Sequence, residues 1–203
     1  MKISEKVKCD SFPCTDVDKN SYVLPYADVD TNNTRIMMIT EAPPNEKDDY
    51  FYADGNPFYL QTTVQAFRDA GAEVYSMQDI LDLGVYITTA VKCGKTQYAI
   101  SNDIMKNCTA LMERELALFP NIRVFMLMGD VAIKMMNVIW KKETGKTVIP
   151  AGSTYKIRGQ VYYYKDKRVF PSYTPAGKNF LIEKSKRRMV AEDIKEALKC
   201  LTS

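Results

Sequence analysis

The sequence predicts an α/β protein of three layers, in which a short and mostly parallel central sheet lies between helices. Continuous apolar runs at 35–39, 85–91 and 123–128 are typical of strands that are buried on both faces. Segments with helical spacing follow these runs, and such alternation favours parallel strands joined by helices. A length of 203 residues suits a single domain over 1–203.

The helices are predicted from apolar spacing and from residues that favour helix ends. Ser101 is a suitable N-cap, and Gly71 is a suitable C-cap. The expected helices cover 61–71, 77–83, 101–118, a segment that begins at Gly129-Asp130, and about 183–200. Segments 162–164 and 168–170 either pair around Asp166 or form one strand and its approach. Residues 1–33 are polar and rich in turns, so we expect an irregular N-terminal arm.

Composition excludes several kinds of chemistry. The chain contains no histidine, which removes histidine-based nucleophile pairs, zinc sites and general bases. Its 28 basic and 25 acidic side chains give a net charge of +3, which neither requires nor excludes a nucleic-acid partner. We find neither a secretory signal nor a run of eighteen apolar residues, so we expect a soluble, cytoplasmic monomer without a membrane partner.

Four segments, each placed at or near a predicted strand, carry the candidate chemistry. They are Ile39-Thr40-Glu41-Ala42-Pro43-Pro44 with Gly55-Asn56-Pro57-Phe58, then Tyr86-Ile87-Thr88-Thr89-Ala90-Val91-Lys92-Cys93, then Cys108 with Met128-Gly129-Asp130, and finally Val169-Phe170-Pro171-Ser172-Tyr173-Thr174-Pro175-Ala176. In a parallel sheet, the loops after the strands meet at one edge and form the ligand site. The order and spacing of the four segments resemble those of the iron–sulfur (family 4) branch of the uracil-DNA glycosylase superfamily over roughly 30–195.

This resemblance implies hydrolysis of the N-glycosidic bond of uracil or another damaged base in DNA. The sugar passes through a cationic state while the base leaves with negative charge, and the base must first be taken out of the stack. Glu41 matches the carboxylate that would orient water or stabilise the sugar cation. Ala42 and Phe58 match base-binding positions, with Tyr52 and Tyr59 as further candidates for the ring. The alternatives are a solvated Glu41 and a Phe58 that packs in the core.

Three positions depart from the family pattern. Thr89 stands where the family has a base-binding asparagine, and one hydroxyl cannot make the same two-point contact. Thr174 stands at the position of the catalytic histidine, and a neutral hydroxyl stabilises an anion less well. Pro44 replaces a glycine and removes a backbone donor. These changes permit a different base, a slower enzyme or a protein that binds without catalysis.

The cysteines suggest a metal centre. Cys93 and Cys108 match ligands of the family's cluster, and Cys9 and Cys14 match the first pair more loosely, because four residues separate them. Four thiolates from separate segments suit a structural [4Fe–4S] cluster, with an all-cysteine zinc site as the alternative. Ordinary buried thiols are the other reading. Lys92, beside Cys93, either offsets the charge of the cluster or is solvated.

A basic segment near the end of the chain suggests contact with single- or double-stranded DNA. Pro175 and Gly177 belong to a loop that resembles the family's minor-groove loop, and Lys178 at its tip could bind phosphate. Arg187 could bind phosphate too, although it could equally lie on the polar face of the last helix. Two other functions stay open: a nucleic-acid-binding protein without activity, and a hydrolase of a small nucleoside-like ligand.

Overall fold

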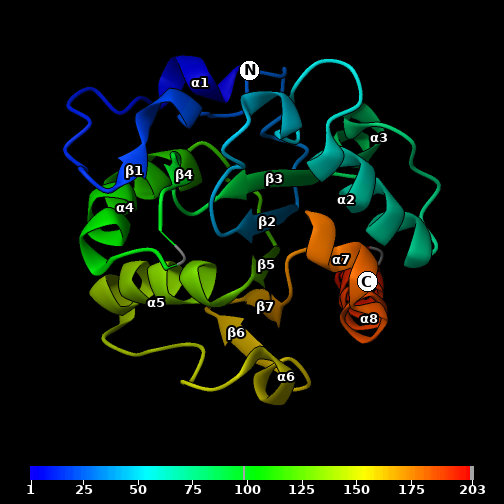
Figure 1. The fold of residues 1–203 in the computed structure, drawn as a ribbon. Helices are drawn as coiled ribbons and strands as arrows, with labels where there is room; N and C mark the ends of the chain where they lie inside the picture. The colour runs from blue at the N-terminus through cyan, green and yellow to red at the C-terminus, as the bar shows by residue number, and fades with distance from the viewer. Residues whose placement is uncertain (98, 202–203) are drawn as a thin grey trace.

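The computed structural model contains a central sheet between two layers of helices, as predicted (Figure 1). It describes residues 1–97 and 99–201, except for the side chains of Lys178 and Asn179. The strand order is β3-β2-β5-β7-β6, with strands β2 (Ile36–Thr40), β3 (Val85–Thr89), β5 (Val124–Met128), β6 (Tyr162–Tyr164) and β7 (Lys167–Ser172). The pairs β2–β3, β2–β5 and β5–β7 are parallel, and β6 joins β7 antiparallel. This antiparallel pairing settles the hairpin alternative for 162–170.

Two pairs of helices cover the two faces of the sheet. In Figure 1, α4 and α5 lie on one side of the strands, and α2 and α8 lie on the other. The helices of eight or more residues are α2 (Phe58–Asp69), α4 (Asn102–Leu116), α5 (Asp130–Thr144) and α8 (Lys184–Lys199). The shorter ones are α1 (Ile3–Lys6), α3 (Met77–Asp82), α6 (Thr154–Ile157) and α7 (Lys178–Ile182). Every residue of β2, β3 and β5 is buried, which explains their continuous apolar sequences.

Local signals explain several helix boundaries. The Ser101 side chain accepts a hydrogen bond from the backbone N–H of Ile104, so Ser101 caps α4 as predicted. Helix α5 starts directly after Gly129, whose φ of 107° is accessible to glycine and strained for other residues. Helix α2 begins three residues earlier than predicted, because Pro57 fixes an extended backbone just before it.

The N-terminal arm is more ordered than its sequence predicts. It contains α1, one 3-10 segment, and β1 (Val17–Asp18), which pairs antiparallel with β4 (Gly94–Lys95). The 3-10 segment Lys19–Ser21 lies in the arm, and the segment Lys47–Asp49 lies in the loop after β2. The pairing of β1 with β4 places the arm beside the segment that follows β3. The sequence did not predict this pairing, because strands of two residues are too short to show an apolar pattern.

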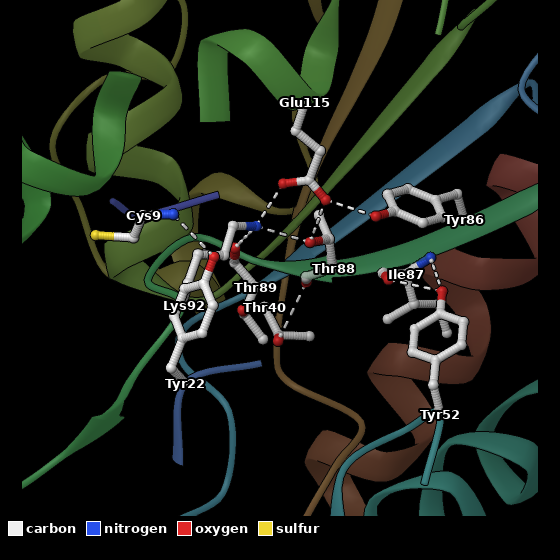
Figure 2. Close-up of polar contacts among 10 residues, drawn as sticks. All are labelled: Cys9, Tyr22, Thr40, Tyr52, Tyr86, Ile87, Thr88, Thr89, Lys92 and Glu115. Carbon is white, nitrogen blue, oxygen red and sulfur yellow. Dashed lines mark hydrogen bonds and ion pairs between the residues drawn. The ribbon is translucent and has the colours of Figure 1, made fainter. Parts of the chain in front are cut away.

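A buried ion pair joins β3 to α4 (Figure 2). The ammonium of Lys92 lies 2.5 Å from Oε2 of Glu115, and both side chains are at most 1% exposed. Lys92 also donates to the Thr88 hydroxyl at 2.8 Å and to the Thr89 carbonyl at 2.5 Å. The interpretation of Lys92 as a solvated residue is therefore wrong.

The other carboxylate oxygen of Glu115 is satisfied from β3. The phenol of Tyr86 donates to Oε1 at 2.5 Å, and the Thr88 hydroxyl donates to it at 2.7 Å. Burial is the main cause that raises the pKa of Tyr86, so its phenol keeps the proton that it donates. Both charges of the pair are therefore surrounded by hydrogen-bonding partners, which is the condition for keeping an ion pair in a core.

We predict that Lys92→Met lowers the free energy of unfolding by about 3–5 kcal/mol, because it leaves the Glu115 carboxylate buried without its cation. Urea unfolding at neutral pH measures the change. The matched control is Lys142→Met, which breaks an exposed pair with Glu113 and should cost less than about 1 kcal/mol. An equal loss of unfolding free energy in both variants would show that the buried pair stabilises the fold no more than the exposed pair does.

Candidate functional site

A cavity of about 320 Å³ lies at the edge of the sheet where the parallel strands end. The walls come from the segments after β2, β3 and β7, from the start of α2, and from α7 and the start of α8. The lining residues are Glu41, Ala42, Pro43, Tyr59, Lys95, Tyr173, Thr174, Ala176, Phe180, Glu183 and Lys186. The cavity thus brings together three residues that were predicted as site residues from distant parts of the sequence: Glu41, Ala42 and Thr174.

Glu41 is held at its backbone and at its side chain. Its carbonyl accepts a hydrogen bond from the Val91 N–H at 3.0 Å, which continues the β2–β3 pairing past the strand end. Its carboxylate contacts the ammonium of Lys95 at 2.9 Å. The Glu41 side chain is 33% exposed, so it faces the cavity with an oxygen accessible to a ligand or to water.

Thr174 lines the cavity, but its hydroxyl hydrogen is directed inward. The Oγ1 atom donates to the carbonyl of Met128 at 2.9 Å. A side chain at Gly129 would come to 3.6 Å from the same oxygen. Thr174 thus links the end of β7 to the end of β5. In this arrangement its oxygen can accept a hydrogen bond from a ligand, whereas its proton is already used.

Of the aromatic residues predicted for the site, Tyr59 lines the cavity, together with Tyr173 and Phe180. The Tyr59 ring packs against Phe51 in a T-shaped contact with centroids 5.5 Å apart, and burial raises the pKa of Tyr59. Phe58 starts α2 and is half-buried, and it is not among the described residues that line the cavity. Tyr52 is buried behind the sheet edge, where its phenol donates to the Ile87 carbonyl at 2.8 Å. Of these rings, Tyr59 is the best placed for a ligand.

Thr89 is fully buried and stands apart from the cavity lining. Its carbonyl accepts from Lys92, whereas its hydroxyl is buried without a hydrogen-bond partner in the described part of the chain. A buried and unpaired hydroxyl is costly unless something satisfies it. The base contact predicted for Thr89 stays a prediction, and a ligand would have to reach behind the lining to meet this hydroxyl.

The predicted DNA loop packs on α2. Pro175 is buried, and Gly177 adopts φ of 91° and donates its N–H to the Thr62 hydroxyl at 3.3 Å. Lys178 is the first residue of α7, and its side chain lies outside the described residues. The loop therefore borders the cavity through Ala176, and its conformation depends on a glycine at 177.

Arg187 has a partner within the protein. Its guanidinium forms two hydrogen bonds with the carboxylate of Asp69 at the end of α2, one of them from Nη2 at 2.8 Å. This bidentate contact holds α8 against α2. A phosphate at Arg187 would have to compete with Asp69. Arg188 is 79% exposed, and its nearest carboxylate is Glu192 at 3.8 Å.

All four predicted ligand cysteines line one small cavity between the arm, the end of β3 and α4. Cys93 and Cys108 are buried, and Cys9 and Cys14 are half-buried. Burial raises the pKa of the Cys93 thiol to about 12, and the nearby Cys108, Cys9 and Cys14 raise it further. Burial also raises the pKa of Cys108, against a hydrogen bond from the backbone of Lys92 and the charge of that residue.

The spacing of these thiols bears on the kind of centre that they could hold. In the described part of the chain, no three histidine, cysteine or acidic side chains are close enough together to hold a single metal ion. A tetrahedral zinc ion with Zn–S bonds of about 2.3 Å needs its sulfurs about 3.8 Å apart. A four-iron cluster keeps its thiolates further apart, because iron and sulfide lie between them. The two kinds of centre thus require different spacings of the same four thiols.

Known proteins resemble this chain over most of its length. The family model described as "Uracil DNA glycosylase superfamily" matches residues 27–198. A type-5 uracil-DNA glycosylase of Thermus thermophilus is 24% identical over 168 residues, which cover 80% of this chain and 74% of that protein. A distant structural likeness exists to the wild-type UNG crystal structure from Nitratifractor salsuginis, with 11% identity, coverage of 85% and 80% of the two chains, and a TM-score of 0.43. No helix in the described part of the chain has the length and apolar character needed to cross a membrane.

We predict that Arg187→Met destabilises the protein by at most about 1 kcal/mol at neutral pH, because both partners of this pair are partly exposed. The Arg187 hydrogen bond is the main cause that lowers the pKa of Asp69 below 3.8. Because the pKa of Asp69 is lower in the folded than in the unfolded protein, its ionised carboxylate stabilises the folded state at any pH above the unfolded pKa. This contribution is lost as the pH falls through the folded pKa.

The difference between wild type and variant should therefore narrow as pH falls below about 4, as measured by urea unfolding over a pH series. The control is Arg188→Met, one residue further along α8, which should change little at any pH. A difference for Arg187→Met that is constant with pH would contradict the ionic origin of its effect.

Proposed function

The chain belongs to the uracil DNA glycosylase superfamily, and from this premise we propose that it is a DNA glycosylase that hydrolyses the N-glycosidic bond of uracil or another damaged base. The observation that carries the proposal is the position of Glu41. This carboxylate lies in a cavity at the carboxyl edge of a parallel sheet, where ligands of such sheets bind. It is also the residue that matches the family's carboxylate.

In the proposed reaction, the base leaves the stack and enters the cavity beside the Tyr59 ring. The C1′–N bond breaks, and its electron pair departs with the base. Glu41 stabilises the sugar cation or orients a water molecule toward C1′. The water oxygen then bonds to C1′, and the proton that it loses passes by way of the Glu41 carboxylate or solvent to the departed base anion, so the products are an abasic site and the free base.

The substitutions at the two threonine positions bear on which base is accepted. Because Thr174 donates to Met128, a base that takes its hydrogen bond would have to replace this contact, and a neutral hydroxyl supplies no cation as a histidine would. Because Thr89 is buried outside the lining, a two-point contact to the base edge would need other groups. Base selection in this protein therefore depends on the shape of the cavity and on its charged side chains.

A second candidate function is a DNA-binding member of the superfamily without catalysis. The inward hydrogen bond of Thr174 favours it, because this contact removes the donor that would help the base to leave. Such a protein would bind DNA with the salt dependence of phosphate contacts and would form no abasic product.

We predict base release from one or more oligonucleotides, single- or double-stranded, that carry uracil, hypoxanthine or xanthine. Alkaline cleavage of the abasic site measures the product. Glu41→Gln should reduce the rate about 100-fold or more, because an amide cannot stabilise a cation or accept the proton of water. Glu113→Gln, which changes an exposed glutamate on α4, should retain the wild-type rate. DNA binding without scission across the whole panel would support the second candidate.

We also propose that Cys9, Cys14, Cys93 and Cys108 hold a structural [4Fe–4S] cluster. Support comes from the one cavity that all four cysteines line. The cluster would supply a covalent link between the N-terminal arm and the sheet, because its ligands come from both. Near it, Asn107 donates to the Cys14 sulfur at 3.4 Å.

We predict that protein purified without oxygen contains about four iron and four sulfide per chain and is brown. Cys108→Ser should lose most of the iron and the visible absorption. Cys200→Ser should retain both, since Cys200 lies at the end of α8, away from the cysteine cavity. One zinc per chain, with no sulfide, would instead identify the zinc alternative.

A further inference from the structure

The cavity contains a cation that none of the sequence motifs indicated. No histidine exists in this chain, and Thr174, at the histidine position, has its proton engaged with Met128. Among the described residues, Lys95 and Lys186 are the cations that line the cavity. Lys186 pairs with Glu183 at 2.6 Å and lies over the Tyr173 ring, whereas Lys95 contacts Glu41 directly.

The contact between Lys95 and Glu41 has the geometry of a charge-assisted hydrogen bond. The ammonium nitrogen lies 2.9 Å from Oε1 of the carboxylate. The two side chains are 38% and 33% exposed, so solvent and a ligand can reach both groups. Lys95 thus orients one of the two carboxylate oxygens, on a side chain that lines the cavity.

Lys95 comes from a segment that is fixed on several sides. It belongs to β4, which pairs antiparallel with β1 of the N-terminal arm. Its neighbour Gly94 donates its N–H to the Ser21 hydroxyl at 3.1 Å. A side chain at Gly94 would come to 2.4 Å from Oγ of Ser21 and 2.6 Å from Oδ1 of Asn45. Ser21 and Asn45 would have to move to admit a larger residue, so the backbone that presents Lys95 is closely packed.

The same segment also holds the backbone of Glu41. Val91, four residues before Lys95, donates to the Glu41 carbonyl at 3.0 Å. Residues 91–95 therefore contact Glu41 at its main chain and at its carboxylate. A carboxylate held at two points needs little rearrangement before the reaction, which is the usual benefit of a preorganised site.

We propose that Lys95 is a positioning residue for the reaction, which orients the Glu41 carboxylate toward the sugar and its attacking water. This assignment rests on the proposed glycosylase function. It places the cation of the site on the segment after β3, instead of on the loop after β7 where the family's histidine would stand.

The test is single-turnover base release at saturating enzyme, on the lesion that the wild type accepts, with DNA affinity measured separately by fluorescence anisotropy. Lys95→Met should lower the rate about 10- to 100-fold while the Kd changes less than about threefold. Lys95→Arg, which keeps a donating cation, should recover most of the rate. The double variant Glu41→Gln/Lys95→Met should be no slower than Glu41→Gln alone, because both changes remove one function.

The matched control is Lys142→Met, which removes a lysine from an exposed pair with Glu113 at 2.6 Å and should leave rate and affinity unchanged. A wild-type rate for Lys95→Met would overturn the proposal. So would a loss of affinity with an unchanged saturating rate, since that result identifies a phosphate contact. The proposal would also be overturned if the double variant lost rate by the product of the two single losses, because the two residues would then act independently.

A separate readout distinguishes failure of this proposal from failure of the proposed function. If the wild type releases no base from any lesion, the glycosylase function fails, and the Lys95–Glu41 contact is then judged by NMR. The ¹³Cδ resonance of Glu41, assigned by its absence in Glu41→Gln, should move in Lys95→Met and stay in place in Lys142→Met. An unmoved resonance in both variants would show that Lys95 does not position Glu41.

Discussion

The buried contact between Lys92 and Glu115 is the interaction on which the rest of this structure depends (Figure 2). It fixes α4 to the end of β3 through Tyr86 and Thr88, which both donate to Glu115. Two full charges are tolerated in this core because every charged atom has a close partner. The pair therefore specifies one register of α4 on the sheet, and that register brings Cys108 on α4 to Cys93, the residue after Lys92.

One short segment connects the buried Lys92–Glu115 pair to the cavity. Residues 89–95 begin in the buried network, pass through Cys93 and end at Lys95, which contacts Glu41. The pairing of β4 with β1 adds the N-terminal arm to the same unit. The cysteine cavity and the candidate active site are thus neighbours along one strand extension. A centre bound by the cysteines would stiffen the segment that carries Lys95, without any chemistry of its own in the reaction.

Membership of the superfamily and the departures from its pattern have a common physical account. The fold keeps a carboxylate at the end of β2, because parallel strands converge at this edge. Both threonines have contacts within the protein: Thr174 donates to the Met128 carbonyl and so links β7 to β5, and the Thr89 carbonyl accepts from Lys92. The charged groups that remain at the cavity are two lysines and two glutamates among the described residues. These side chains line the cavity together with Tyr59, Tyr173 and Phe180.

The sequence by itself determined the layers, most element boundaries and the gathering of Glu41, Ala42 and Thr174, because apolar periodicity and strand-end position are local properties of the chain. Tertiary structure alone decided the rest. It placed Tyr59 instead of Phe58 on the cavity, joined Arg187 to Asp69, buried Lys92 and brought Lys95 to Glu41. Each of these contacts pairs residues from separate elements or depends on where one helical turn points. Only the packed chain sets such distances, since no residue type or spacing encodes them.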